Sequence, residues 1–318
     1  MLDITEGKAR YDRCAKKLLS FKAIDAWILK ACVEEFSCCA VEYISEHCLT
    51  GAVEISEHAV HQDQPNRNHE LNGDEQVTQM NAESSSVREG TAYFDIRFNA
   101  VAPGDVKPIS LIINLEIQTD DKPGYELVTR GTYYCARMLS EQHGTIFTDD
   151  HYEKLRKVYS IWVCPSVPQH RKNGIFCYRT IEEAVLGERY VEKEAYDLYE
   201  VIILNLGDAG NETGSSILDL LNTLFSAELS SAEKKSILSK RYHIAMTKEM
   251  ESEVQHMCNL SDWVENKGIV KGIDIGNLDA TIRYYKRGRI SLKEAADDLN
   301  LTVDQFKEKL NQYEYATV

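Results

Sequence analysis

The sequence feature that most constrains the fold is an alternating run from Ile109 to Gln118, read ISLIINLEIQ. Side chains on a β-strand point alternately to its two faces, so every second residue of this run shares a face. One face would carry Leu111, Ile113, Leu115 and Ile117, and the other Ile112, Asn114, Glu116 and Gln118. The run therefore predicts a strand with one wholly apolar face and an opposite face that ends in polar residues.

A shorter run with the same alternation, YFDIRF, extends from Tyr93 to Phe98. If the two strands pair, Asp95 joins Glu116 and Gln118 in one polar patch beside an apolar sheet. Burying two acids and an amide together is costly unless something pairs with them. A divalent metal ion would pair with them, so the patch predicts a metal site.

The chain has 318 residues, a net charge of −15 and nine cysteines. Its length allows one large domain or two. The acidic balance argues against a protein that coats nucleic acid unselectively, because such binding depends on clustered Lys and Arg. The net charge does not exclude a local basic surface. The odd number of scattered cysteines, without C-x-x-C, predicts reduced thiols rather than a disulfide framework.

Two further features predict a cytoplasmic protein. No apolar run approaches the roughly 18 to 20 residues that span a bilayer. The N-terminal segment MLDITEGKARYDRC has no apolar signal-peptide core. We therefore expect no membrane partner.

An amphipathic helix is predicted from Phe21 to Phe36, and its acidic end carries Glu34 and Glu35. Charged pairs on a helix usually face water, which is the simplest interpretation of these two acids. A zinc site also has to be weighed, because several cysteines and histidines follow. These residues are Cys38, Cys39, His47, Cys48, His58 and His61. Their spacing fits no paired four-ligand zinc pattern.

The stretch 61–90 is polar and nearly devoid of aromatic or branched apolar residues. Such a composition predicts a long flexible insertion. It could act as a flap that contacts substrate, although polar composition alone creates no interface.

A helix is predicted after the turn TDDKPG, and Arg130, Tyr134 and Arg137 share one of its sides. Because the helix leaves the sheet directly after Glu116 and Gln118, its arginines could hold phosphate oxygens near the metal patch. Alternatively, the arginines pair with neighbouring acids on the surface. The sequence spacing does not decide between these two roles.

Apolar runs at 157–165, 174–179 and 198–206 predict further strands of the sheet, and a glycine-rich loop after 207 marks a boundary. The rest is predicted to be helical, with an extension at 208–277 and a tail at 278–318. Ser291 and Thr302 would open two short helices of that tail, in a helix-turn-helix-like pattern. Its basic patch comprises Arg283, Lys286, Arg287 and Arg289. The tail either binds DNA or serves as a packing element or dimer contact.

With an Asp on one strand, E-x-Q ending the next, and Arg and Tyr four apart on the following helix, the chain resembles the PD-(D/E)XK nuclease superfamily. More narrowly, it resembles the PD-(D/E)XK nuclease family transposases, relatives of the recombination-promoting nucleases. The resemblance covers about residues 9–207. The segments that carry it are YDRCAKKLLSFKAIDAWILKACVEEF, YFDIRF, LIINLEIQ, GYELVTRGTYYCARML and KVYSIWVC.

The resemblance implies a role for each matching residue. Asp95 and Glu116 would be the metal-binding acids, and Glu35 could be the acid that the first helix contributes. Arg130 and Tyr134 would occupy the catalytic positions of the following helix. Gln118 stands where the family usually has Lys, and an amide offers hydrogen bonds without the positive charge of an ammonium. The metal would be Mg²⁺, with Mn²⁺ as a substitute, because Mg²⁺ prefers oxygen ligands and takes few carboxylates.

We therefore expect an α/β protein with a restriction-endonuclease-like mixed sheet flanked by helices, and a helical C-terminal extension. Residues 1–207 would form the nuclease-like domain, with the flexible insertion at 61–90. The expected function is Mg²⁺-dependent hydrolysis of DNA phosphodiester bonds, with Arg137 and the basic tail contacting DNA and a homodimer as one option. The alternative is a DNA-binding or assembly protein whose nuclease site is degenerate at Gln118. A third alternative is a purely structural scaffold, which would bind no nucleic acid at any salt concentration.

Overall fold

The computed structural model describes residues 4–55, 83–86, 90–104, 107–120, 123–188, 191–299, 301–303, 305–307 and 310. The helices are α1 (Ile4–Leu19), α2 (Lys22–Cys32), α3 (Val41–Tyr43), α4 (Leu127–Ser140), α5 (Ser216–Phe225), α6 (Ser231–Tyr242), α7 (Lys248–Lys286) and α8 (Leu292–Asp298). The strands are β1 (Leu49–Ile55), β2 (Glu83–Ser86), β3 (Gly90–Tyr93), β4 (Ile96–Ala102), β5 (Ile109–Ile117), β6 (Val158–Cys164), β7 (Gly174–Arg179) and β8 (Tyr199–Asn205).

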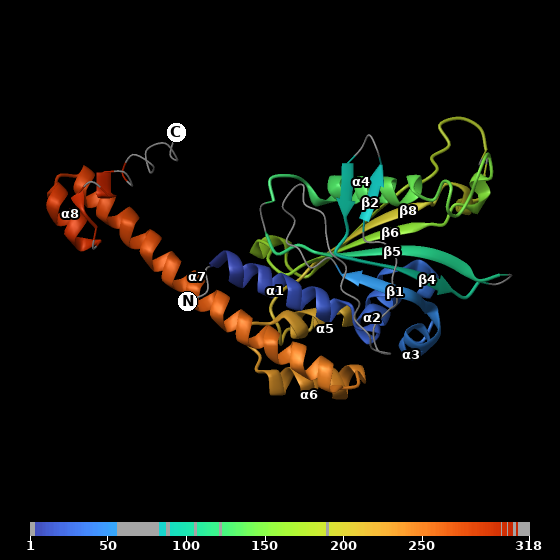
Figure 1. Ribbon diagram of the computed structural model, residues 1–318, viewed down its shortest axis with the longest axis horizontal. Coiled ribbons are helices and arrows are strands. Elements are labelled where there is room, and N and C mark those ends of the chain that lie inside the picture. Colours follow the sequence, from blue (N-terminus) through green and yellow to red (C-terminus); the bar gives the residue numbers. More distant parts are fainter. Residues whose placement is uncertain are drawn as a thin grey trace. The chain divides into compact units, whose positions relative to one another are not determined.

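Six of the strands form one mixed sheet in the order β1-β4-β5-β6-β8-β7 (Figure 1). The central strands β5, β6 and β8 are parallel, whereas β1, β4 and β7 run antiparallel to their neighbours. The predicted α/β class with a mixed sheet flanked by helices is confirmed. The strands expected at 157–165, 174–179 and 198–206 are β6, β7 and β8.

Helices cover both faces of this sheet, and the alternation along β5 decides which residues face which helices. Leu111, Ile113, Leu115 and Ile117 join a core shared with α1, α2 and α5, and Ile112 joins a second core with α4. The α4 face is tightly packed at Gly131, where an added Cβ would lie 2.5 Å from Cγ1 of Val201. Such close contact fixes α4 over the sheet, on the face to which Glu116 belongs.

The short run expected as a single strand from Tyr93 to Phe98 is broken in the structure. β3 ends at Tyr93 and pairs with β2 in a separate two-stranded sheet, whereas β4 begins at Ile96. Between them, the Phe94 ring packs edge-on against Tyr134, with ring centroids 5.0 Å apart. The side chain of Asp95 accepts a hydrogen bond from the main-chain N–H of Ile117 on β5. This side-chain contact replaces main-chain strand pairing at Asp95.

The insertion expected at 61–90 falls mainly outside the described residues. Its described part includes β2, so a short strand occurs where the sequence predicts only a loop. The expected amphipathic helix at 21–36 is shorter than predicted, because α2 ends at Cys32 and a single 3₁₀ turn, η1 (Glu34–Phe36), follows. Val33 between them is extended, with φ −110° and ψ 115°.

The helices α5 and α6 and the first part of α7 belong to the same core as the sheet. Leu220, Leu224, Leu238 and Val254 are buried in one cluster with α1 and α2. The chain divides into two compact units, Met1–Ser261 and Asp262–Val318, so α7 starts in the first and ends in the second. The region expected as a separate extension at 208–277 is therefore shared between the two units.

The second unit has a small core of its own around Ile282, Ala295, Ala296 and Phe306. Gly288 ends α7 with a positive φ of 66°, which glycine adopts without strain. Ser291 and Glu294 then form a reciprocal capping box at the start of α8. Thr302 caps the next helical turn in the same way through Gln305. Both helix starts expected from the sequence are present.

Asp25 on α2 is a buried acid without a hydrogen-bond partner, since it is 1% exposed and both carboxylate oxygens are unpaired. Burial raises its pKa well above the ordinary value. A raised folded pKa favours the neutral acid, so this residue costs stability increasingly as pH rises above its unfolded pKa. We expect Asp25→Ala to raise the free energy of unfolding by about 1–3 kcal/mol at pH 8, and by less at pH 5.

Urea unfolding of the wild type, Asp25→Ala and Asp25→Asn at the two pH values checks this. The Asn variant keeps a polar group but cannot ionise, so it should lose the pH dependence and gain less stability than the Ala variant. A destabilised Ala variant with the wild-type pH dependence would contradict the assignment.

Candidate functional site

Asp95 and Glu116 lie side by side where β4 begins and β5 ends. The main-chain N–H of Asp95 donates to Oε1 of Glu116 at 3.0 Å. In return, the N–H of Ile117 donates to Oδ2 of Asp95 at 3.0 Å. Both side chains are buried. The two acids predicted to form one patch are therefore brought together, and each carboxylate is oriented by the other's strand.

A third element supplies a cation to this pair. Nζ of Lys16 on α1 lies 2.8 Å from Oδ1 of Asp95 and 2.8 Å from Oδ2 of Asp12, and its side chain is 3% exposed. Burial alone would lower the pKa of Lys16, but the two carboxylates outweigh burial and raise it, so the ammonium stays charged. We refer to Asp12, Lys16, Asp95 and Glu116 as the acid–lysine site.

Asp12 and Lys16 were not predicted as site residues, although both lie in the segment YDRCAKKLLS that carries the family resemblance. Their spacing of four on a helix is the only sequence signal, and it is also the spacing of common surface ion pairs. The structure adds the decisive observation, which is that this pair is buried against Asp95.

The surroundings of Glu116 raise its pKa. Burial and then the negative charge of Asp95 raise its pKa well above the ordinary value, against smaller opposing effects of Arg130 and Lys16. Burial also raises the pKa of Asp12. The site therefore holds three acids around one ammonium, and additional positive charge would favour their ionised forms.

Arg130 and Tyr134 on α4 border the same site. Nε and Nη2 of Arg130 donate to the Tyr134 hydroxyl at 3.0 and 2.6 Å. The guanidinium lies over the Trp162 ring, 5.3 Å from its centroid, and also donates to the Tyr125 hydroxyl. Burial alone would lower the pKa of Arg130, but the Tyr134 hydroxyl and, to a smaller extent, Glu116 raise it. Aromatic contacts thus hold Arg130 beside the acids.

Arg137, expected to contact DNA, is 5% exposed and points into the protein. Arg97 of β4 pairs with Glu141 at the end of α4. The contacts described above for Arg130 are with Tyr125, Tyr134 and Trp162, rather than the surface ion pairs with acids that were the alternative role.

Gln118 lies one residue beyond β5 and continues the strand, since its main-chain N–H donates to the carbonyl of Val163 at 2.8 Å. Its side-chain Nε2 donates to the carbonyl of Asp120 at 3.0 Å. Gln118 also lines a cavity of about 650 Å³. It therefore joins β5, which carries Glu116, to the cavity lining.

Glu35 is held elsewhere. Its carboxylate accepts a hydrogen bond from the Tyr159 hydroxyl at 2.6 Å and lies 3.6 Å from Nζ of Lys157. Tyr159 precedes Trp162, the register partner of Glu116, by three residues, or about 10 Å along the strand. Tyr159 also belongs to the core on the opposite face of the sheet. The structure does not bring Glu35 together with Asp95 and Glu116.

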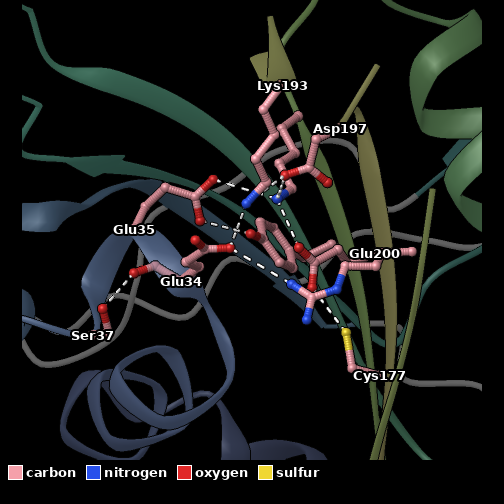
Figure 2. Close-up of polar contacts among 10 residues, drawn as sticks. Glu34, Glu35, Ser37, Cys177, Lys193, Asp197 and Glu200 are labelled. Atoms are coloured by element: carbon pink, nitrogen blue, oxygen red, sulfur yellow. Dashed lines mark hydrogen bonds and ion pairs between the residues drawn. The ribbon is translucent and has the colours of Figure 1, made fainter. Parts of the chain in front are cut away.

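Glu35 instead belongs to a second acidic cluster, shown in Figure 2. The other acids of this cluster are Glu34, Asp197 and Glu200. One oxygen from each of Glu34, Asp197 and Glu200 lies within 4.8 Å of the others, so these three could hold a metal ion. Nζ of Lys157 is already 2.7 Å from Asp197 and 2.8 Å from Glu200. Nζ of Lys193 lies 2.7 Å from Glu34 and 3.5 Å from Asp197. Two lysine ammonium groups therefore already pair with these three carboxylates, and we call this group the Lys157 cluster.

In the second unit, the side chains of the predicted basic patch are exposed: Arg283, Lys286, Arg287 and Arg289. The Arg289 guanidinium lies over the Tyr284 ring, 5.9 Å from its centroid. Exposed cations beside an aromatic ring are compatible with contact to phosphates and bases.

Comparison with protein-family models, with curated proteins and with solved structures gives no match. Among the helices that the structure describes, none is long and apolar enough to cross a bilayer.

Proposed function

We propose that the chain is a metal-dependent DNA endonuclease with a restriction-endonuclease-like fold, of the type found in PD-(D/E)XK transposases. The observation that carries the proposal is the paired arrangement of Asp95 and Glu116 at the junction of β4 and β5, with Lys16 against Asp95. The mixed sheet between α1 and α4 is compatible with that fold.

The donor set fits Mg²⁺ or Mn²⁺. Both ions prefer oxygen ligands, and Mg²⁺ in particular binds through one or two carboxylates together with water and phosphate oxygens. Asp95 and Glu116 supply such oxygens. Burial and then the charge of Asp95 raise the pKa of Glu116, and a divalent cation would counter both effects. When bound, the ion would activate a water and neutralise charge on the phosphate.

The remaining roles fall to the chain's own residues. Lys16 supplies a positive charge beside Asp95, which offsets the absence of a lysine at position 118. Arg130, held by Tyr134 and Trp162, can bind a phosphate oxygen through its guanidinium. The side chain of Asp95 keeps its orientation through the Ile117 N–H. Hydrolysis of a phosphodiester bond is the reaction that this set serves best.

Incubation of the purified protein with supercoiled plasmid in Mg²⁺, Mn²⁺ and EDTA tests the proposal. We expect relaxed or linear DNA with either metal and intact plasmid with EDTA. Intact plasmid in all three conditions would count against an active nuclease.

The second candidate function is a DNA-binding or assembly protein with an inactive site. It is favoured by the position of Lys16, which already neutralises Asp95, and by the amide at position 118. Calorimetry separates the two functions. Metal binding that is present in the wild type and lost in Asp95→Ala supports the nuclease, and no metal binding in either protein supports the second candidate.

Gln118 offers a graded test of the proposed chemistry. If its amide orients the attacking water or a phosphate oxygen, Gln118→Ala should slow cleavage by about 10²-fold, as expected for losing one preorganised donor. Gln118→Lys should keep activity but need more Mg²⁺, because an added cation repels the ion. Cleavage rates against Mg²⁺ concentration for the three proteins provide the measurement. A Gln118→Ala protein as fast as wild type would make the residue a bystander.

The basic tail should contribute to DNA affinity through release of counterions. Replacing Arg283, Lys286, Arg287 and Arg289 by Gln should make the slope of log affinity against log salt less steep by roughly 3 to 4 for duplex DNA. Fluorescence anisotropy across a salt series measures the slope, with Lys235→Gln in the first unit as a control. An unchanged slope in the fourfold variant would leave the tail as a packing element.

A further inference from the structure

The 650 Å³ cavity lies at the carboxyl ends of all three parallel strands. Gln118 follows β5, Cys164 ends β6 and Asn205 ends β8, and all three residues line it. In open α/β sheets, ligands commonly bind in the crevice outside these strand ends. The cavity volume also lies within the range of sites that hold small organic groups.

Aromatic side chains from two different elements line this cavity. Phe176 and Tyr178 project from the same face of β7 because they are two residues apart, and they are 45% and 42% exposed. Tyr125, in the segment before α4, is also exposed. Large aromatic rings in contact with water, gathered around one hollow, form a surface on which a flat ring can stack.

The polar groups of the cavity indicate a neutral ligand. Arg171 brings one positive charge, whereas Asp120 and Glu126 bring two negative charges. A phosphate would be repelled by this balance, but an uncharged heterocycle would not. The amides of Gln118 and Asn205 offer donors and acceptors of the kind that hydrogen-bond base edges.

Two residues that line the cavity, Gln118 and Tyr125, relate it to the acid–lysine site. Gln118 is two residues beyond Glu116 on the same strand. The Tyr125 hydroxyl accepts a hydrogen bond from Arg130, which borders Glu116. A group bound here would therefore belong to a nucleotide near the phosphate that the acids are proposed to hydrolyse.

We propose that this cavity binds an unpaired nucleobase of the DNA substrate, stacked on Phe176 and Tyr178. The proposal rests on the proposed nuclease function, because that function supplies the strand to which the base belongs. It predicts that the protein prefers DNA with an unpaired base, at an end, a loop or a distorted step, over continuous duplex.

The test measures binding of the full-length protein to a fluorescent single-stranded oligonucleotide in EDTA, where metal-dependent cleavage is prevented. We expect Phe176→Ala/Tyr178→Ala to weaken binding by about five- to 150-fold, the range for losing the stacking of one base. For an oligonucleotide of abasic residues, the variant and the wild type should bind equally. Tyr152→Ala, at an exposed tyrosine outside the cavity lining, is the matched control and should bind both ligands like wild type.

A variant that binds the normal oligonucleotide as tightly as wild type overturns the proposal, as does an equal loss for normal and abasic strands. If the double variant does not fold, photocrosslinking of the wild type to a 5-iodouracil-substituted oligonucleotide decides instead. The crosslinked peptide should contain residues 174–179, and crosslinks confined to other segments would reject the cavity.

This outcome is separable from that of the nuclease proposal. Metal-dependent cleavage together with unchanged binding by the cavity variant would reject the cavity alone. Base-dependent binding without cleavage under any metal condition would reject the nuclease and keep the cavity as a base-binding site.

Discussion

Alanine at Asp95 or at Glu116 is expected to abolish metal-dependent plasmid cleavage, lowering the rate by about 10³-fold or more. Each substitution removes a carboxylate that would hold the ion, and the ion is expected to contribute several kcal/mol of charge stabilisation in the transition state. Initial rates of plasmid nicking against Mg²⁺ concentration measure the effect. Asp208→Ala removes a solvent-exposed acid paired with Lys172 and is the matched control, with wild-type rates expected.

A Glu116→Gln variant separates a lost ligand from a damaged fold. Burial holds the pKa of Glu116 above its unfolded value, so the neutral form is favoured in the folded protein. The resulting stability is present at low pH and is lost as pH rises above the unfolded pKa. Glutamine stays neutral and can still accept the N–H of Asp95.

We therefore expect Glu116→Gln to be inactive and yet more stable than wild type at neutral pH, with the difference shrinking toward pH 5. Thermal unfolding at several pH values, beside the cleavage assay, provides both readings. An inactive but strongly destabilised variant would mean that Glu116 serves the fold, and a fully active one would remove it from the site.

The sequence was sufficient for most of the sheet, because its strands have simple patterns. Strand faces that are buried need apolar residues. The alternation along β5 and the apolar runs of β6 and β8 therefore indicate these strands in the sequence. The same alternation gave a wrong prediction at Tyr93 to Phe98. Polar and apolar residues alternate through the whole run, but the strand is interrupted between Tyr93 and Ile96. The break depends on Asp95 bonding to the main chain of β5, a long-range contact that no local pattern contains.

The site was predictable only in part for the same reason. Asp95 directly precedes β4 and Glu116 lies on β5, so the pairing of β4 with β5 brings them together. Lys16 reaches Asp95 from a helix 79 positions earlier in the chain, and its pairing with Asp12 resembles an ordinary surface ion pair. Glu35 looked suitable because it ends an amphipathic helix, but the extended Val33 redirects the chain toward Tyr159 and Lys157.

Lys157→Met is expected to cost about 3–5 kcal/mol of unfolding free energy, the usual effect of removing one partner from a buried ion pair. The Lys157 side chain is 9% exposed, and Asp197 and Glu200 around it are buried as well. Oδ1 of Asp197 already has no hydrogen-bond partner, so little remains to compensate the lost ammonium. Nearby carboxylates outweigh burial and raise the pKa of Lys157. Its contribution is therefore fully present below the unfolded lysine pKa and is lost only as pH rises through the higher folded value.

Lys193→Met is the matched control, because Lys193 pairs with Glu34 and Asp197 of the same cluster but is 42% exposed. Exposed pairs contribute roughly 0–1 kcal/mol, so this variant should stay close to wild type in urea unfolding at pH 7.

The Lys157→Met protein should also acquire a response to divalent cations. Without the ammonium, Glu34, Asp197 and Glu200 retain oxygens close enough to share an ion. Millimolar Ca²⁺ or Mn²⁺ should then restore part of the lost stability in Lys157→Met, because an ion that binds only the folded chain stabilises it by mass action. The wild type, in which Lys157 already pairs with Asp197 and Glu200, should respond less. A variant within 1 kcal/mol of wild type, or one indifferent to both ions, would show that Lys157 does not hold these acids together.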